Sequence, residues 1–158
     1  MMAMDFSKKV VFITGAASGI GAAQAQAFLT TGAYVFAFDQ QKQEMLTLQM
    51  NYPEQFAFFI GDVREKIALK KAIRKCHEHF GTVNILLNTV GVLDDYLPLH
   101  DTDEELWSNI LTTNLNSMFT LTKLLLPELL ENQGTVINMA SIAGLVAGGG
   151  GIANKTSK

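Results

Sequence analysis

Three glycines near the N-terminus have a spacing that suits the binding of a phosphate group. Gly15, Gly19 and Gly21 follow the apolar run 9–14 and open an alanine-rich stretch of helical character. Glycines at such a strand-to-helix turn let the backbone approach a pyrophosphate, whose charge the helix N-terminus stabilises. Ser18 is placed to cap that helix or to bond a phosphate. The sequence therefore predicts a dinucleotide-binding turn.

An acidic residue at the end of the next apolar run predicts which dinucleotide is bound. Asp39 directly follows the run 34–38 and lies about 20 residues beyond the glycines, as in dinucleotide-binding sheets. A carboxylate at this place bonds the ribose 2′-hydroxyl of NAD and repels the 2′-phosphate of NADP. Lys42 offsets part of that repulsion, and no arginine occurs in 40–43. We therefore expect NAD as the preferred cofactor, although not as an absolute requirement.

Short apolar runs alternate with longer amphipathic segments along the whole chain. The predicted strands are 9–14, 34–38, 56–60, 83–88 and 135–139, and the predicted helices are 22–31, a helix ending at Met50, 64–80 and a long region 103–132 with a kink at Pro127. Strict alternation predicts parallel strands with helices on both faces. The expected fold class is α/β, a Rossmann-like doubly wound parallel sheet with strand order 3-2-1-4-5.

The unusual polar residues fall at the ends of these predicted strands. They are the glycine turn 15–21, Asp39, Asp62, Asn88 and Ser141. In open α/β sheets the ligand lies beyond the carboxyl ends of the strands, where the strand order reverses. The five positions therefore predict one shared site.

The glycine turn also identifies a family that the chain resembles. Residues 14–21 have three residues between the first two glycines, where the ordinary G-x-G-x-x-G motif has one. In this form the chain resembles the short-chain dehydrogenase/reductase family over nearly its whole length. The resemblance implies an oxidoreductase that interconverts a small secondary alcohol and a ketone with NAD, similar to a 3-oxoacyl-carrier-protein reductase. It also implies a homo-oligomer, a dimer or tetramer, because the helix equivalent to 106–130 packs against its copy in the family.

The resemblance assigns further residues to the cofactor. Ile20 lies within the glycine motif, and Asp62 with Val63 is similar to the family's acid-plus-aliphatic pair, whose carboxylate bonds the adenine amino group. Asn88 and Gly91 belong to a loop similar to the family's Asn-Asn-Ala-Gly. All five residues are therefore expected to join the cofactor site.

Three residues match the catalytic positions of the family, and one position departs from it. The resemblance implies that Ser141 orients the substrate carbonyl, that the backbone of Asn114 holds a water of the proton relay, and that Lys158 bonds the nicotinamide ribose and tunes the acid. The family's tyrosine is replaced by Asn154, four residues before the lysine. A phenol near an ammonium has a lowered pKa and can give its proton to a ketone, whereas a carboxamide can only hydrogen-bond. A catalytically silent nucleotide-binding protein is therefore the alternative to an active enzyme.

Composition excludes several other classes of function. The net charge is −3 and no basic stripe occurs, so neither nucleic acid nor an anionic membrane is an expected partner. No apolar run reaches the roughly 20 residues that span a bilayer, and the segment before Lys9 lacks the apolar core of a signal peptide. Cys76 is the single cysteine, and His77 and His79 face apart on a helix, so no metal site is expected. We expect a soluble cytoplasmic protein.

The family's fold is longer than this sequence. After the lysine it continues with two more strands and a segment that covers the substrate. We therefore expect residues 1–158 to form a single NAD-binding domain that lacks these parts, either as a fragment or as a chain that depends on a partner. A fragment that binds nothing is a third possibility. The glycine run 148–151 predicts a flexible loop.

Overall fold

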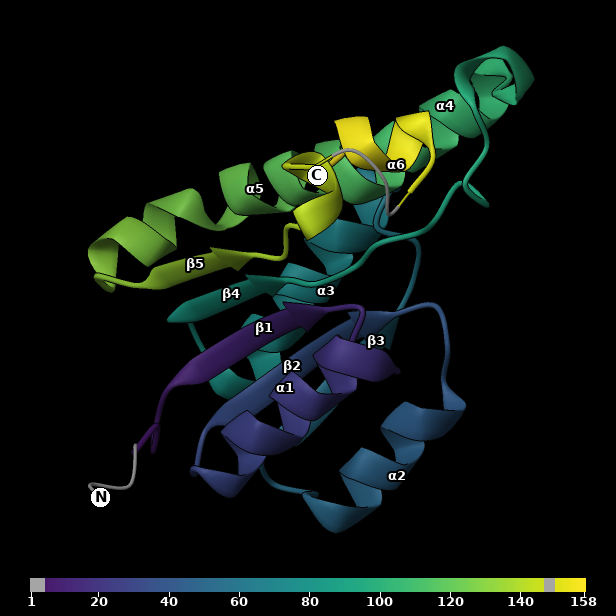
Figure 1. Ribbon diagram of the computed structural model, residues 1–158. Coiled ribbons are helices and arrows are strands. Elements are labelled where there is room, and N and C mark those ends of the chain that lie inside the picture. The colour runs from purple at the N-terminus through teal and green to yellow at the C-terminus, as the bar shows by residue number, and fades with distance from the viewer. Residues whose placement is uncertain (1–4, 147–149) are drawn as a thin grey trace.

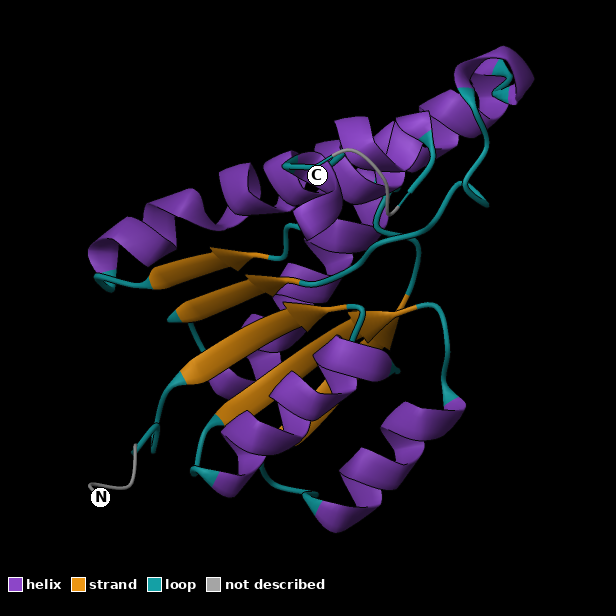
Figure 2. Ribbon diagram, in the orientation of Figure 1, coloured by secondary structure: helices purple, strands orange, loops and turns teal. Residues whose placement is uncertain are grey.

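The computed structural model describes residues 5–146 and 150–158. Its five strands form one parallel sheet in the order β3-β2-β1-β4-β5, which confirms the predicted topology (Figures 1 and 2). The strands are β1 (Val10–Thr14), β2 (Tyr34–Asp39), β3 (Phe56–Ile60), β4 (Ile85–Asn88) and β5 (Thr135–Asn138). The order reverses at β1, between β2 and β4. Part of the predicted glycine loop 148–151 lies outside the described residues.

Helices cover both faces of the sheet (Figure 2). They are α1 (Gly19–Thr30), α2 (Gln43–Asn51), α3 (Lys66–Phe80), α4 (Glu104–Leu111), α5 (Ser117–Glu131) and α6 (Ile152–Thr156). On one face, Leu29 of α1 and Met45 of α2 pack with Ile13. On the other, Leu69 of α3 and Leu125 of α5 belong to the core around the strand phenylalanines. No helix of the described chain is both long enough and apolar enough to cross a membrane.

Burial along the strands follows from this layering. Every residue of β1 is buried, as expected for a strand that is covered on both faces and reads as a continuous apolar run. At the edge of the sheet, β5 is mostly exposed, and Ile137 is 44% exposed to solvent. The well-packed centre of the sheet is thus the part that carries the glycine turn.

The long helical region predicted at 103–132 is interrupted. A π-helical turn, Thr112–Asn116, separates α4 from α5, while Pro127 lies inside α5. The sequence predicts an irregularity at the proline but not the π turn, because no residue within that turn is a helix breaker. Single π turns within α-helices are frequent at functional sites. Here the turn contains Asn114.

Candidate functional site

The backbone of the glycine turn favours glycine at all three positions, for different reasons. Gly15 and Gly19 have φ angles of +72° and +52°, in the left-handed region that side chains disfavour. Gly21 has an ordinary φ, but a Cβ there would lie 2.0 Å from the carbonyl oxygen of Gly15. The first turn of α1 therefore packs directly on the end of β1.

A cavity of about 390 Å³ opens beside this turn, at the carboxyl ends of the strands. Eight predicted cofactor residues line it: Gly15, Ser18, Gly19, Ile20, Gly21, Asp39, Val63 and Gly91. The other lining residues were not predicted from the sequence as cofactor residues; they are Gln40, Gln41, Gly61, Thr89, Val90, Val92 and Thr113. Most of these follow the end of a strand, and that position would have identified them.

Asp39 is held against the glycine turn by backbone donors. Its Oδ2 accepts a hydrogen bond from the Ala17 amide at 2.9 Å, and its Oδ1 accepts from the amides of Gln40 and Gln41 at 2.7 and 3.1 Å. A carboxylate offers about four acceptor positions, so one stays open on Oδ2. The carboxylate is thus oriented, and it can still accept from a hydroxyl in the cavity.

The N-terminus of α1 completes a cradle for a charged group. The Ser18 hydroxyl makes no capping hydrogen bond, so it remains available to a ligand. Nothing lies within 4 Å of the place where a Cβ of Gly19 would stand. Unpaired first-turn amides and the helix dipole favour an anion at such a place. The residues present therefore fit the pyrophosphate and adenosine ribose of a dinucleotide.

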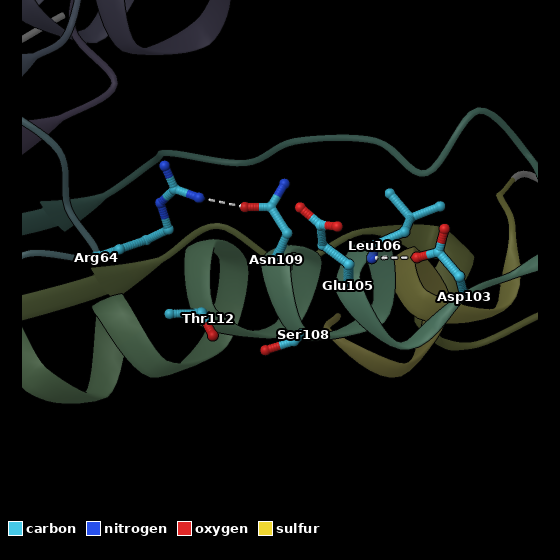
Figure 3. A pocket seen from close by; sticks show the side chains of 7 residues that line it. All are labelled: Arg64, Asp103, Glu105, Leu106, Ser108, Asn109 and Thr112. Carbon is cyan, nitrogen blue, oxygen red and sulfur yellow. Dashed lines mark hydrogen bonds between the residues drawn. The ribbon is translucent and has the colours of Figure 1, made fainter.

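The Asp62 carboxylate pairs with an arginine and does not line the cavity. The Arg64 Nε atom donates to Asp62 Oδ1 and Oδ2 at 3.0 and 2.9 Å, and this bond holds the pKa of the Asp62 carboxyl below its usual value. The guanidinium also reaches Asn109 of α4 (Figure 3). The predicted bond from Asp62 to adenine stays a prediction, and it requires an acceptor position that Arg64 leaves open.

The same arginine borders an open groove of about 620 Å³ along α4 (Figure 3). The groove is lined by Arg64, Asp103, Glu105, Leu106, Ser108, Asn109 and Thr112. Asp103 caps α4 by accepting a hydrogen bond from the Leu106 amide at 2.7 Å. This carboxylate is therefore explained by the helix that it begins.

Asn88 lies outside the cavity lining. Its Nδ2 donates to Asn138 Oδ1 at 2.8 Å and to Thr122 Oγ1 at 3.1 Å. These bonds connect the end of β4 to β5 and α5. Asn88 therefore supports the frame of the site in this structure, and its contact with the cofactor stays a prediction.

Asn114 ties three segments together from the π turn. Its Oδ1 accepts from the Val92 amide at 2.8 Å, and its Nδ2 donates to Val92 O at 3.0 Å and to Ser157 Oγ at 2.9 Å. The residue is almost fully buried. The side chain thus fixes the loop after β4 and the end of α6, so a role in a water relay would have to use its backbone.

Lys158 reaches the cavity wall. Its Nζ lies 2.9 Å from the place where a Cβ of Gly91 would stand, close to Asn114. Burial lowers the pKa of the Lys158 ammonium below its usual value. The tertiary structure therefore brings the last residue of the chain to the loop that the glycine turn also contacts.

The two remaining polar positions near Lys158 are Ser141, at the start of a short turn, and Asn154, in α6. The Ser141 Oγ accepts from the Ala143 amide at 3.2 Å and begins the short turn Ile142–Gly144. That turn packs on Lys158, because a Cβ of Gly144 would lie 2.8 Å from the lysine carbonyl carbon. Asn154 is buried, and within the described residues its Oδ1 has no hydrogen-bond partner.

Metal-dependent chemistry has no ligand set in the described parts of the chain. No group of three or more His, Cys, Asp or Glu side chains there could hold an ion. What the arrangement offers instead is a nucleotide cradle beside a polar cluster that contains the Lys158 ammonium.

Comparison with known proteins then decides the family. The family model described as short chain dehydrogenase matches residues 9–158. The chain belongs to the short-chain dehydrogenase/reductase family. A family member, 3beta-hydroxysteroid dehydrogenase 2 of Eggerthella lenta, is 32% identical over 151 residues, which cover 92% of this chain and 58% of that protein. The 3-oxoacyl-acyl-carrier-protein reductase of Thermotoga maritima is 29% identical, with coverage of 90% and 59%.

Solved structures of short-chain dehydrogenases share the fold. One from Brucella melitensis superposes with a TM-score of 0.92 at 24% identity and covers 99% of this chain and 66% of its own. The present chain thus spans about three fifths of the length of the curated relatives it matches. The activities named for these relatives are varied, and they belong to the longer proteins.

Proposed function

We propose that this chain is the dinucleotide-binding part of an NAD-dependent oxidoreductase that interconverts a small secondary alcohol and a ketone. The observation that carries the proposal is the oriented Asp39 carboxylate, which faces the cavity with one acceptor position open beside the glycine turn. This position suits a ribose 2′-hydroxyl and disfavours a 2′-phosphate. The proposed unit is the single domain 1–158, and its substrate site would be completed by segments present in the longer relatives.

The chain's own residues would divide the work as follows. The glycine turn and the N-terminus of α1 hold the pyrophosphate, and Asp39 bonds the adenosine ribose. Lys158 donates to the nicotinamide ribose from the wall beside Gly91, while Asn114 holds that wall in place. Ser141 donates to the substrate carbonyl. The nicotinamide, when bound, supplies the hydride. A 3-oxoacyl thioester is the substrate class that the resemblance favours.

Binding of the dinucleotide is tested by titration. We expect NADH fluorescence to change on binding, with a lower Kd for NADH than for NADPH at equal ionic strength. Tighter binding of NADPH would contradict the assignment of Asp39. The absence of binding to either cofactor would favour a fragment that binds nothing.

A second candidate function is nucleotide binding without turnover, and Asn154 favours it. A carboxamide donates hydrogen bonds but loses no proton in the accessible pH range. Its Oδ1 is buried without a partner among the described residues. If the chain is silent as written, Asn154→Tyr should raise ketone reduction by the roughly 10²- to 10⁴-fold that general acid catalysis contributes. Equal turnover in both proteins would refute the need for a phenol here.

Two further properties belong to the same proposal. We propose a homo-oligomer in which α5 packs against its copy, because Phe119, Leu126 and Leu130 of that helix are exposed at 64%, 43% and 71%. We also propose a cytoplasmic location, which fractionation of cells that express the chain would test.

A further inference from the structure

A buried carboxylate lies in the loop that follows β4. Asp94 is 1% exposed, and no Lys or Arg within the described residues forms an ion pair with it. A charge removed from water needs hydrogen-bond donors to offset the cost of its desolvation. Two backbone amides provide them: Gly151 donates to Oδ1 at 3.0 Å, and Asn154 donates to Oδ2 at 2.8 Å.

Both amides belong to the N-terminal end of α6. The first amides of a helix have no partner within the helix, so a side chain from elsewhere can satisfy them. Gly151 precedes the helix, and Asn154 is its third residue. The contact is close, because a Cβ at Gly151 would lie 2.5 Å from Asp94 Oδ2. The Ile152 amide adds a bond of 3.3 Å to Leu97 O in the same loop.

The other end of α6 is held from the same region. The Asn114 Nδ2 atom donates to Ser157 Oγ at 2.9 Å, while Asn114 also bonds both backbone groups of Val92. The short helix is thereby fixed at both ends to the loop after β4, directly by Asp94 at its start and through Asn114 at its end. An isolated helix of five residues would not be stable, so these contacts determine where it lies.

We propose that Asp94 is a positioning residue that fixes α6, the helix of Asn154, and thereby places Lys158 beside Gly91 at the cavity wall. The assignment rests on the proposed function in one respect, namely that Lys158 has a task at the dinucleotide. The positioning itself is a property of the chain without ligand. Both parts can therefore be tested separately on the same protein.

The test is the pair of variants Asp94→Asn and Asp95→Asn. Both remove one negative charge from adjacent positions, but Asp95 is exposed and makes no bond to α6. In Asp94→Asn, an NH2 group replaces one of the two acceptor oxygens, so one of the two backbone amides faces a second donor and loses its hydrogen bond. We expect amide hydrogen exchange in residues 150–158 to become roughly 10- to 100-fold faster in Asp94→Asn, as for the loss of a hydrogen bond to a charged acceptor. Exchange in β1 and β2 should not change.

A second readout follows the lysine. The pH midpoint of Lys158 acylation, measured by mass spectrometry with Lys155 as internal reference, should rise in Asp94→Asn because the ammonium becomes hydrated. Loss of a nearby negative charge alone would move that midpoint down. A rise therefore separates repositioning of α6 from a simple charge effect.

Several results would overturn the proposal. These are unchanged exchange in residues 150–158, the same acceleration in Asp95→Asn, acceleration throughout the sheet, or an unchanged or lower Lys158 midpoint. If Asp94→Asn does not fold, Gly151→Ala perturbs the same contact from the helix side and should give the same two responses. A parallel NADH titration separates this proposal from the proposed function. If the parent chain binds no NADH but amide exchange in residues 150–158 is faster in Asp94→Asn, only the proposed function is refuted.

Discussion

At the scale of single residues, Asp39 combines a structural and a predicted binding role. It accepts three backbone hydrogen bonds around the glycine turn and keeps one acceptor position towards the cavity. The sequence position alone predicted the second role. Only the structure revealed the first, which means that its replacement acts on both the turn and the ligand.

Asp39→Asn should therefore weaken NADH binding by roughly 10- to 100-fold, the effect of losing a hydrogen bond to a charged acceptor. NADPH binding should fall less, because the repulsion of its 2′-phosphate is removed as well. Fluorescence titration with both cofactors measures the change. Asp95→Asn carries the same loss of charge outside the cavity and should leave both affinities unchanged. An unaltered ratio of NADH to NADPH affinity in Asp39→Asn would refute the ribose assignment.

Lys158 gives a prediction for stability against pH. Burial lowers its pKa in the folded chain below the unfolded value of 10.5. Between these two pKa values the unfolded chain binds more protons, so the free energy of unfolding rises with pH there. Below the folded pKa, the cost of the buried charge is fully present.

Lys158→Met removes that cost. Relative to the parent chain, the variant should be more stable to urea at pH 7, and its advantage should shrink as the pH approaches 10.5. Urea unfolding at several pH values measures this difference. Lys155→Met removes a charge from α6, three residues before Lys158, and serves as the control. An advantage of Lys158→Met that grows with pH would show that the sign is wrong.

At the scale of elements, the connection between β1 and α1 is the best determined. The extended run, the glycines and the alanine-rich helix were all predicted from the sequence, since each depends on residues close together in the chain. The structure added that Gly21 is required by a contact with the Gly15 carbonyl and not by its own φ. Glycine is thus needed for different physical reasons at different positions of the same motif.

Gly21→Ala should destabilise the fold by about 1–3 kcal/mol, as for overpacking at a closely packed position, because the Gly15 carbonyl has to move. Gly19→Asn is the matched control, since asparagine tolerates a positive φ and open space surrounds that position. Urea unfolding compares the two variants with the parent chain. Equal stability of Gly21→Ala and the parent would contradict the close contact.

At the scale of the whole molecule, the faces of the sheet differ in what they leave exposed. The outer face of α5 carries large apolar side chains, and β5 forms an exposed edge. Exposed apolar clusters of this kind are typical of interaction surfaces. Two copies of the chain that pack together through α5 would cover the apolar side chains of that helix.

Phe119→Lys should therefore shift the chain towards the monomer at a given concentration, measured by sedimentation equilibrium. Met50→Lys makes the same change at a side chain that is 74% exposed on α2, on the opposite face of the sheet, and should have no effect. Association that persists unchanged in Phe119→Lys would exclude α5 as the contact between copies.

The sequence by itself determined the fold class, the glycine turn and the place of Asp39. These depend on periodicity, on spacing over about 20 residues, and on the rule that ligands meet parallel sheets at their carboxyl ends. For the same reason most predicted cofactor residues line one cavity. The prediction was weaker for Asp62 and Asn88, whose partners in the structure, Arg64 and Asn138, are matters of side-chain geometry.

Only the tertiary structure decided how the chemical half of the site is held. Asp94 meets Gly151 and Asn154 across 57 and 60 positions of the chain, and Asn114 meets Ser157 across 43. No local pattern encodes such contacts, because they arise where the loop after β4, the π turn and α6 converge in space. The carboxylate of Asp94 looks like one more surface acid in the sequence, and only packing removes it from water.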